Sequence, residues 1–512
     1  MMQLYDVFRY LGFFLLTAGL SSCATPVSVE GIPQKDFYFV HNSNERINAR
    51  QERFEHEYQQ IAERRNNNGF EHQPIASPAK VIGLGLSGGG IRSAAFQLGI
   101  LSGLHDQQLA DKNMLDRIDY ISSVSGGSWA NGAYWAWQRS DDDLFTCLDT
   151  NARRGFDNVL PPCDATISLL RTEQEPKVFV FAGTGQRKEQ WEEDAKNAYL
   201  SHSCNIRFSD KASACLPATK RKPYPIFNTT HDAVNSNTAD LQNTPFQITP
   251  DYVGTLLDHD HDNSGFFVRN DAKDFNWRND KWMFSEDKPG DSLSVTLATS
   301  SAVVGGLPLL LEYDFILNYK NKPVKGIRER IVMTDGGFTE NLGLVPLIER
   351  GSNLIILSDI GWTDKPLSDL DLAKQQVKKL LGCDVSTIGG AETDMVRLLT
   401  YDCPSVAENN NHSKGTILYV KPYRWNIEGF RKYLKNEKLV ELLECVDEKT
   451  KNCLTGKPDN KSLDQKYRFP QSPTMQSSYD KRLIRSYYLL GKYVSETYIG
   501  EEMQKWLNQH NP

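Results

Sequence analysis

The sequence lacks several features that would assign it to common protein classes. It has no apolar run long enough to cross a membrane: the run near the N-terminus, Leu11 to Leu20, is about half of the ~20 residues that a spanning helix needs. It has no excess of basic residues, since 58 Lys and Arg stand against 65 Asp and Glu, and the net charge of −7 gives no electrostatic footprint for nucleic acid. It contains no internal repeat and no low-complexity tract, which excludes a solenoid or a propeller.

The first 23 residues have the layout of an export signal. The apolar run has the length of a signal-peptide core and ends in Leu-Ser-Ser-Cys at 20–23. This ending resembles the bacterial lipoprotein signal, in which the cysteine becomes the lipidated first residue. The resemblance implies a signal peptide over 1–22, a lipid anchor at Cys23 and, with Ala24 next, an exported outer-membrane lipoprotein facing the periplasm or the cell exterior. An ordinary signal peptide whose cleavage site happens to contain a cysteine remains open.

Eight further cysteines lie in polar stretches and fall as four local pairs. No Cys-x-x-Cys occurs, so zinc is disfavoured, and in an oxidising compartment such cysteines form disulfides. Eight cysteines allow on the order of 100 pairings, among which we expect nearest neighbours to pair. The expected pairs are Cys147 with Cys163, Cys204 with Cys215, Cys383 with Cys403, and Cys445 with Cys453.

Beyond residue 78, short apolar stretches alternate with helical patterns, which is typical of an α/β sheet with helices on both faces. Within the polar N-terminal segment 23–77, residues 45–65 have the pattern of a charged helix, either a solvated stalk or a docking helix. No Pro-, Gly- or Ser-rich linker divides 78–505, so we expect one catalytic domain with polar, Cys-bearing insertions at about 140–222 and 364–470. The expected strands are 80–86, 117–125, 224–230, 245–249, 328–336 and 352–360, and the expected helices are 91–109 and 126–138.

The glycine-rich stretch at 83–93, GLGLSGGGIRS, admits three interpretations. Its Gly-x-Gly-x-x-Gly fits a dinucleotide-binding loop, but no carboxylate for the ribose follows the next strand, which ends at 123–127. Its Gly-x-Ser-x-Gly fits an elbow that presents Ser87 as a nucleophile, but this leaves the third glycine and Arg92 unexplained. In the third interpretation, the three glycines point backbone N–H groups at an anion, helped by the N-terminus of the following helix.

The third interpretation gives a function to the second glycine-rich turn as well. Ester cleavage needs a nucleophile and nearby N–H donors for the oxyanion. The strand at 117–125 ends in the tight turn Val-Ser-Gly-Gly-Ser-Trp at 124–129, which would present Ser125. Both turns follow neighbouring strands at their carboxyl ends, where open α/β sheets place their sites.

Three motifs in this order resemble the patatin-like and cytosolic phospholipase A2 superfamily. They are Ser-Gly-Gly-Gly-x-Arg at 87–92, Val-Ser-Gly-Gly-Ser-Trp at 124–129 and Thr-Asp-Gly-Gly-Phe-Thr-Glu-Asn-Leu at 334–342, and the resemblance runs from about 79 to 360. It implies a three-layer α/β/α fold. One position departs from the Gly-x-Ser-x-Gly pattern of the nucleophile: Ser123 replaces glycine, so Ser123, Ser125 and Ser128 are not fully separated by sequence.

The resemblance implies a Ser–Asp dyad without histidine, with Ser125 as nucleophile and Asp335 as base. It implies that Gly88, Gly89 and Gly90 hold the oxyanion, and that Arg92 either meets a lipid phosphate or braces the loop. Asn341 is expected to hold the Asp335 loop. The implied substrates are phospholipids or lysophospholipids at a membrane or micelle surface, and no cofactor or metal is implied.

Two alternatives remain open. A classical Ser–Asp–His esterase would use His412, which follows Ser125 and Asp335 in the expected order but sits in a polar loop. A catalytically inactive lipid-binding lipoprotein would also fit the signal, although Ser125, Asp335 and the three glycines are all present. The acidic and histidine-rich run at 258–262 lacks the spacing of a calcium loop and is expected to be a solvated loop.

Overall fold

The computed structural model describes residues 37–40, 43–69, 80–109, 112–137, 140–155, 222–232, 244–255, 265–269, 275–279, 331–361, 367–391, 394–403, 414–447, 453, 469–471 and 480–510, and short strands between 303 and 323. The expected signal peptide, Cys23 and most of the expected insertion at 140–222 lie outside these residues. In the part of the chain that is described, no helix is both long and apolar enough to cross a membrane.

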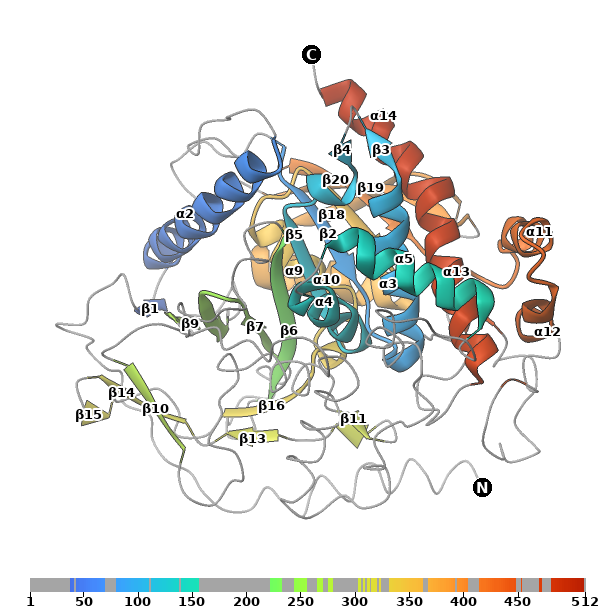
Figure 1. Ribbon diagram of the computed structural model, residues 1–512. Coiled ribbons are helices and arrows are strands. Elements are labelled where there is room, and N and C mark those ends of the chain that lie inside the picture. The colour runs from blue at the N-terminus through green and yellow to red at the C-terminus, as the bar shows by residue number, and fades with distance from the viewer. Residues whose placement is uncertain are drawn as a thin grey trace, which may run out of the picture.

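The centre of the molecule is a mixed β-sheet (Figure 1). Its five middle strands are parallel, and they lie in the order β6 (Tyr224–Asp232), β5 (Tyr120–Val124), β2 (Ile82–Leu86), β17 (Leu354–Ser358) and β20 (Lys414–Val420). Antiparallel strands extend both sides: β7 (Thr244–Ile248), β8 (Tyr252–Thr255), β9 (Gly265–Arg269) and β1 (Phe37–Val40) beyond β6, and β19 (Val396–Asp402) and β18 (Asp384–Gly389) beyond β20. With β16 (Ile331–Asp335), which pairs with β6, the six strands expected from the sequence are confirmed.

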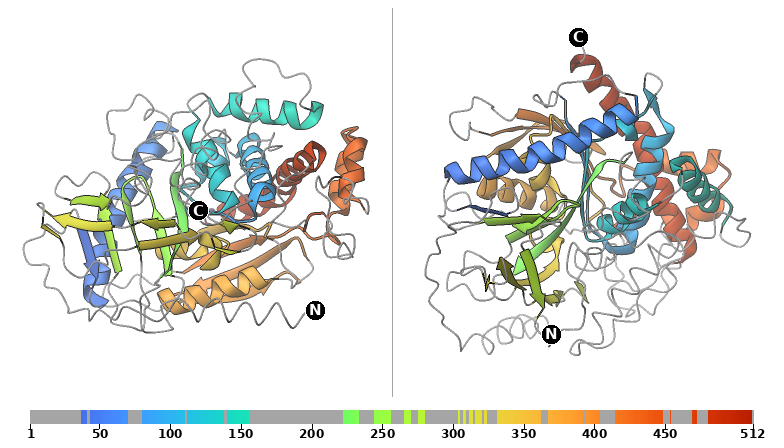
Figure 2. Two further views of the ribbon diagram at one scale, coloured as in Figure 1. Left: turned by 90° about the horizontal axis from the view of Figure 1, so that it is seen from below. Right: turned by 60° about the vertical axis from the view of Figure 1, so that its left-hand side comes forward.

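Helices cover both faces of the sheet (Figure 2). Along β17, Leu354 and Ile356 pack into the core with α3 (Gly90–Asp106), α4 (Gly126–Ala136) and α13 (Lys481–Val494). The alternate residues Ile355 and Leu357 pack into a second core with α9 (Leu344–Glu349) and α10 (Ser368–Leu381). Because both faces are buried, the central strands are almost continuously apolar. The expected three-layer α/β/α fold is confirmed.

The segment 364–470 supplies more of the sheet than the polar insertion expected from the sequence. It contains α10 and strands β18 to β20, and β20 is one of the five parallel strands. Elsewhere in the described part of the molecule, further helices and strands are α5 (Asp141–Arg154), α11 (Glu428–Asn436), α12 (Leu443–Val446), α14 (Gly500–His510), β16 (Ile331–Asp335), β13 (Leu311–Tyr313), β10 (Phe275–Asn279), β14 (Phe315–Tyr319), β15 (Lys322–Pro323), β11 (Val303–Val304), β12 (Leu307–Pro308), β3 (Gln108–Leu109) and β4 (Lys112–Asn113).

One edge of the long strand β6 is shared by two neighbours, while β7 pairs along its other edge. Its first half pairs in parallel with β5, as far as Val124 opposite Asn228. Its second half pairs antiparallel with β16, beginning with Asp335 opposite Thr229. Since Asn228 and Thr229 are adjacent, the carboxyl end of β5 meets the carboxyl end of β16. The residues at these two ends are therefore brought together although they are 210 positions apart.

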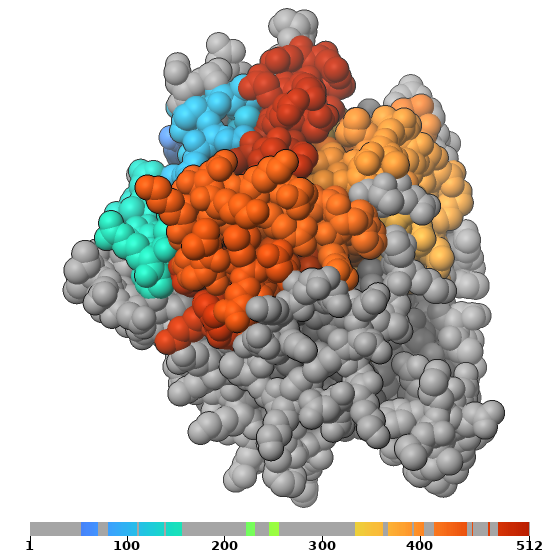
Figure 3. All heavy atoms as spheres, turned by 90° about the vertical axis from the view of Figure 1, so that its right-hand side faces the viewer, coloured from blue at the N-terminus to red at the C-terminus, as the bar shows by residue number. Residues whose placement is uncertain are grey.

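Helix α3, which begins at the glycine-rich loop, is packed closely against α13. A methyl group added at Gly99 would lie 1.9 Å from the carbonyl oxygen of Tyr488, and one added at Gly491 would lie 2.0 Å from that of Phe96. The two backbones can approach this far only because both positions lack a side chain. On the face shown in Figure 3, α11 and α12 (orange) pack beside α13 (red).

Helix α2 (Ser43–Asn67) is a docking helix, one of the two forms expected from its charged sequence. Arg350 Nε and Nη2 donate to the two carboxylate oxygens of Glu57 at 2.7 and 2.8 Å, and both side chains are buried. Asp119, at the amino end of β5, anchors the other end of the helix. Three further ion pairs hold α2: Arg53 with Glu349, and Arg64 and Arg65 with Asp119. Together with the Glu57–Arg350 pair, they place α2 across the amino ends of the strands.

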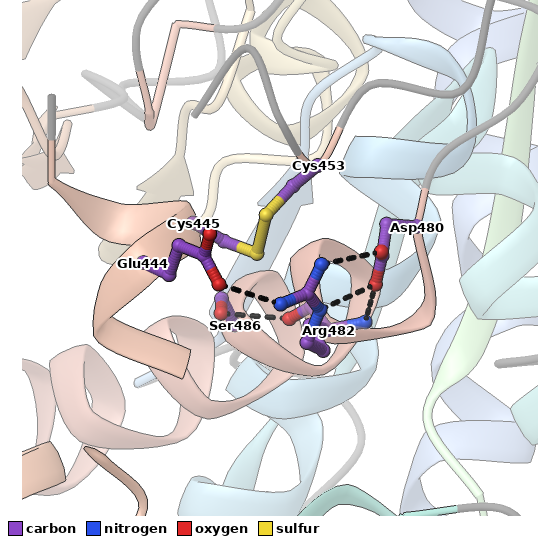
Figure 4. Close-up of a disulfide and its surroundings, with 6 residues drawn as sticks. All are labelled: Glu444, Cys445, Cys453, Asp480, Arg482 and Ser486. Atoms are coloured by element: carbon purple, nitrogen blue, oxygen red, sulfur yellow. Dashed lines mark hydrogen bonds and ion pairs between the residues drawn. A yellow bond between two sulfur atoms is a disulfide. The ribbon is translucent and has the colours of Figure 1, made fainter. Parts of the chain in front are cut away.

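Two of the expected disulfides are confirmed. Cys383 and Cys403 bond across the base of the β18–β19 hairpin. Cys445 in α12 bonds to Cys453 (Figure 4). Cys147 is also disulfide-bonded; the other three cysteines of the expected pairs, Cys163, Cys204 and Cys215, lie outside the described residues.

Candidate active site

Ser125 lies at a sharp turn between β5 and α4. Its φ of 51° and ψ of −123° are a strained conformation, which costs an ordinary residue about 1–3 kcal/mol and is typical of a nucleophile elbow. The turn packs directly on the glycine-rich loop, because a methyl group at Gly126 would lie 2.0 Å from the carbonyl oxygen of Gly90. Small residues after the serine therefore allow two loops from neighbouring strands to touch.

Asp335 ends β16 and faces this serine. Ser125 Oγ donates a hydrogen bond to Asp335 Oδ2 at 2.6 Å, and the Gly337 N–H donates to Oδ1 at 2.7 Å. Burial raises the pKa of Asp335 to about 6, against the opposing effect of these two hydrogen bonds. The carboxylate is thus ionised at neutral pH, yet it is a stronger base than a free aspartate.

The other candidate serines have structural partners. Ser123 Oγ donates to the carbonyl oxygen of Ile226 at 3.2 Å and accepts from Ser128 Oγ at 3.2 Å. Ser87 Oγ accepts from the Ile360 N–H at 2.9 Å, which ties the end of β2 to the segment after β17. Both Ser87 and Ser123 are fully buried. Of the serines that the sequence left unseparated, Ser125 is the one hydrogen-bonded to Asp335.

The glycine-rich loop lies against Ser125. A methyl group at Gly88 would lie 3.0 Å from Ser125 Cβ, so little space separates the loop from this serine. Gly89 has a φ of 139°, which glycine adopts far more readily than other residues. The Gly88 N–H already donates to the carbonyl oxygen of Asn341 at 3.0 Å. Gly89 and Gly90 come at the start of α3, where N–H groups have no partner within the helix.

Arg92 is fully buried beneath this loop. A methyl group at Gly89 would lie 3.1 Å from Arg92 Nη2, so the guanidinium occupies the space that the glycine leaves open. Burial raises the pKa of Asp369, the second residue of α10, and the positive charge of Arg92 is one of the groups that oppose this rise. Of the two roles expected for Arg92, this burial favours bracing the loop over contact with a lipid phosphate.

A cluster of charged residues behind the loop was missed by the sequence reasoning. Asp359 Oδ2 accepts hydrogen bonds from Lys421 Nζ at 2.8 Å and Tyr419 OH at 2.6 Å. Lys421 Nζ also lies 3.8 Å from Asp369 Oδ2. One signal could have found two of its members: Asp359 and Lys421 directly follow the buried strands β17 and β20, just as Ser125 follows β5.

The residues of the alternative sites are not brought to this dyad by the described structure. His412 and the run at 258–262 lie outside the described residues. His510, in the last helix, contacts the carbonyl oxygen of Trp506 through Nδ1 at 2.8 Å. Within the described residues, no group of three or more His, Cys, Asp and Glu side chains could hold a metal ion.

Comparisons with known proteins bear on the family and the fold of the chain. A model of the patatin-like phospholipase family matches residues 84–348, slightly more than half of the chain. Human GIVD cytosolic phospholipase A2 matches at 12% identity with a TM-score of 0.53, over 90% of this chain and 67% of its own. The same human protein in complex with methyl gamma-linolenyl fluorophosphonate matches at 13% identity with a TM-score of 0.48, over 90% of this chain and 64% of its own. This chain therefore spans about two thirds of the length of these structures, and no curated protein sequence matches it.

Proposed function

The chain belongs to the patatin-like phospholipase family, a family of lipid acyl hydrolases, and on that premise we propose that it cleaves fatty-acyl esters of phospholipids or lysophospholipids through a Ser125–Asp335 dyad. The observation that carries the proposal is the hydrogen bond of 2.6 Å from Ser125 Oγ to Asp335 Oδ2. It joins a strained serine turn to a buried carboxylate of raised pKa at the carboxyl edge of the parallel strands.

Asp335 is proposed to act as general base and then as general acid. It takes the proton of Ser125 while Oγ attacks the ester carbonyl, and it returns this proton to the leaving lysolipid or glycerol oxygen. A water molecule then repeats the sequence on the acyl-enzyme and releases the fatty acid. A pKa of about 6 for Asp335 suits both directions of transfer near neutral pH.

The oxyanion of each tetrahedral intermediate is proposed to bind backbone N–H groups of the glycine-rich loop. Gly89 and Gly90 are the better candidates, because the Gly88 N–H donates to Asn341. Each such donor contributes about 2.7–4 kcal/mol to transition-state stabilisation. The positive end of the α3 macrodipole supports the same charge.

We further propose that the protein is exported and anchored to a membrane through a lipid on Cys23, with the outer membrane as its site. The sequence at 20–23 and the two disulfides in polar segments support this placement, since disulfides persist in oxidising compartments. Replacing Cys23 by serine should release the protein from membranes into the soluble fraction. An unchanged membrane fraction for this variant would remove the anchor from the proposal.

The test of function is fatty-acid release from phospholipid micelles by the protein without residues 1–23, with and without a metal chelator. Ser125→Ala and Asp335→Asn should lose activity by at least about 10³-fold. Ser87→Ala changes a buried serine of the neighbouring loop but retains the proposed nucleophile and base, so it should stay active. The chelator should have no effect. Loss in His412→Ala would instead support a triad, and an inert wild-type protein would support a lipid-binding lipoprotein.

A further inference from the structure

Asn341 lies between the two loops that carry the proposed chemistry. Its carbonyl oxygen accepts the Gly88 N–H at 3.0 Å, which ties it to the glycine-rich loop. Its side-chain Oδ1 would lie 2.2 Å from a methyl group at Gly88 and 3.0 Å from one at Gly337. Gly337 in turn donates to Asp335. The Asn341 side chain therefore fills the space between the glycine-rich loop and the turn that carries Asp335.

The other end of this amide is held by α10. Asn341 Nδ2 donates to Asp369 Oδ2 at 3.3 Å. The two ends of an amide have nearly the same shape, so hydrogen-bond partners decide which way it points. An ionised carboxylate only accepts hydrogen bonds, and it therefore keeps the NH₂ end on its own side. The acceptor Oδ1 is left facing the two glycines.

Charged groups from three other elements surround Asp369. Asp359 follows β17, Lys421 follows β20 with its Nζ 3.8 Å from Asp369 Oδ2, and Arg92 approaches from α3. Burial and the charge of Asp359 raise the pKa of Asp369 to about 6, while Lys421, Asn341 and Arg92 oppose this rise. At pH 8 the group is ionised and can only accept a hydrogen bond from Asn341.

We propose that Asp369 is a positioning residue: by fixing the orientation of the Asn341 amide, it holds the glycine-rich loop and the Asp335 turn in fixed positions relative to each other. This inference rests on the proposed function, because its effect is exerted on the Ser125–Asp335 dyad and the loop beside it. Asp369 itself touches neither substrate nor nucleophile in this scheme. Its contribution is made in the transition state, so it changes kcat and leaves KM unchanged.

The test measures kcat and KM for fatty-acid release at pH 8 in Asp369→Ala, Asn341→Ala and the double variant. Misplacement of the loop should lower kcat by about 10- to 100-fold in Asp369→Ala, with KM unchanged. The double variant should be no slower than Asn341→Ala, because both changes remove the same link. Asp369→Asn keeps one acceptor oxygen but adds a donor NH₂, so it fixes the Asn341 amide less strictly and should give a kcat between those of Asp369→Ala and the wild type. Asp371→Ala, an exposed position on the same helix, is the matched control and should be unchanged.

The outcomes separate the two proposals. If the wild-type protein releases no fatty acid, the proposed function fails. This inference fails alone if the wild type is active but the double variant loses the product of the two single-variant losses. It also fails alone if Asp369→Ala raises KM and leaves kcat unchanged, because Asp369 is then only structural. Should Asp369→Ala not fold, as judged by thermal unfolding, Asn341→Ala decides: a wild-type kcat in that variant overturns the inference.

Discussion

At the scale of the residue, the proposed chemistry depends on the environment of one carboxylate. Asp335 is 5% exposed, and this burial outweighs two hydrogen bonds to raise its pKa to about 6. The same burial would be costly without those bonds, because a buried charge needs partners. Ser125 and the Gly337 N–H supply them, so the group is stable as a carboxylate and still basic.

The raised pKa predicts the pH dependence of activity. A general base must be ionised, so kcat/KM should be constant above about pH 7, fall to half near pH 6 and decline tenfold per unit below it. The measurement is fatty-acid release from pH 4.5 to 9, with folding checked at each pH. The pKa of Asp369 lies in the same range. The acid limb is therefore also measured in Asp369→Asn, in which Asp335 is the one of these two carboxylates that still titrates. A limb near pH 4 in both proteins would contradict this assignment of the base.

At the scale of the element, α2 stabilises the sheet from the edge opposite the site. Glu57 and Arg350 are 0% and 1% exposed and form a bidentate ion pair, while Gln247 Oε1 accepts from Arg350 Nη1 at 2.9 Å. Removing Glu57 leaves a buried guanidinium with one strong partner fewer. The helix is therefore held by a few buried charges, and each of them matters.

Glu57→Gln should lower the free energy of unfolding by about 3–5 kcal/mol, the usual cost of breaking a buried ion pair. Urea unfolding measures this change, and kcat below the unfolding transition should stay at the wild-type value because α2 does not reach the dyad. Glu63→Gln, an exposed position on the same helix, is the control and should cost less than about 1 kcal/mol. Equal costs for the two variants would mean that the ion pair contributes no net stability.

The elements differ in how well the sequence predicts them. Strands β2, β5 and β16 are short apolar runs that end in glycine or serine turns, so both they and the candidate residues after them can be predicted locally. The contact of Ser125 with Asp335 cannot be predicted from local sequence, because it depends on the pairing of β6 with both β5 and β16. Strand β20 was missed because its apolar residues stand between polar stretches. The partners of α2, Glu349 and Arg350, lie almost 300 positions away, which no local pattern reveals.

At the scale of the whole molecule, disulfides fasten the periphery to the α/β centre. Cys453 is bonded to Cys445 in α12, and its carbonyl oxygen accepts the Asp480 N–H at 3.0 Å where α13 begins. Arg482 of α13 donates to Asp480 at 2.9 Å and to Glu444 of α12 at 2.8 Å, so this side chain links the same two helices a second time (Figure 4). Since α13 packs on α3, this corner supports the helix that begins at the glycine-rich loop.

The two described bridges should therefore contribute to global stability without taking part in the chemistry. They close loops of 20 and 8 residues, and constraint of the unfolded chain gives about 2–4 kcal/mol for each. Cys445 and Cys453 are fully buried, so dithiothreitol should not reduce their bridge until denaturant opens the fold. Cys383→Ala/Cys403→Ala and Cys445→Ala/Cys453→Ala should each lower the urea midpoint, while kcat of the folded protein is retained. Peptide mapping without reduction should recover both cross-linked pairs. If dithiothreitol reduces a bridge in the folded protein and the urea midpoint does not shift, that bridge does not stabilise the fold.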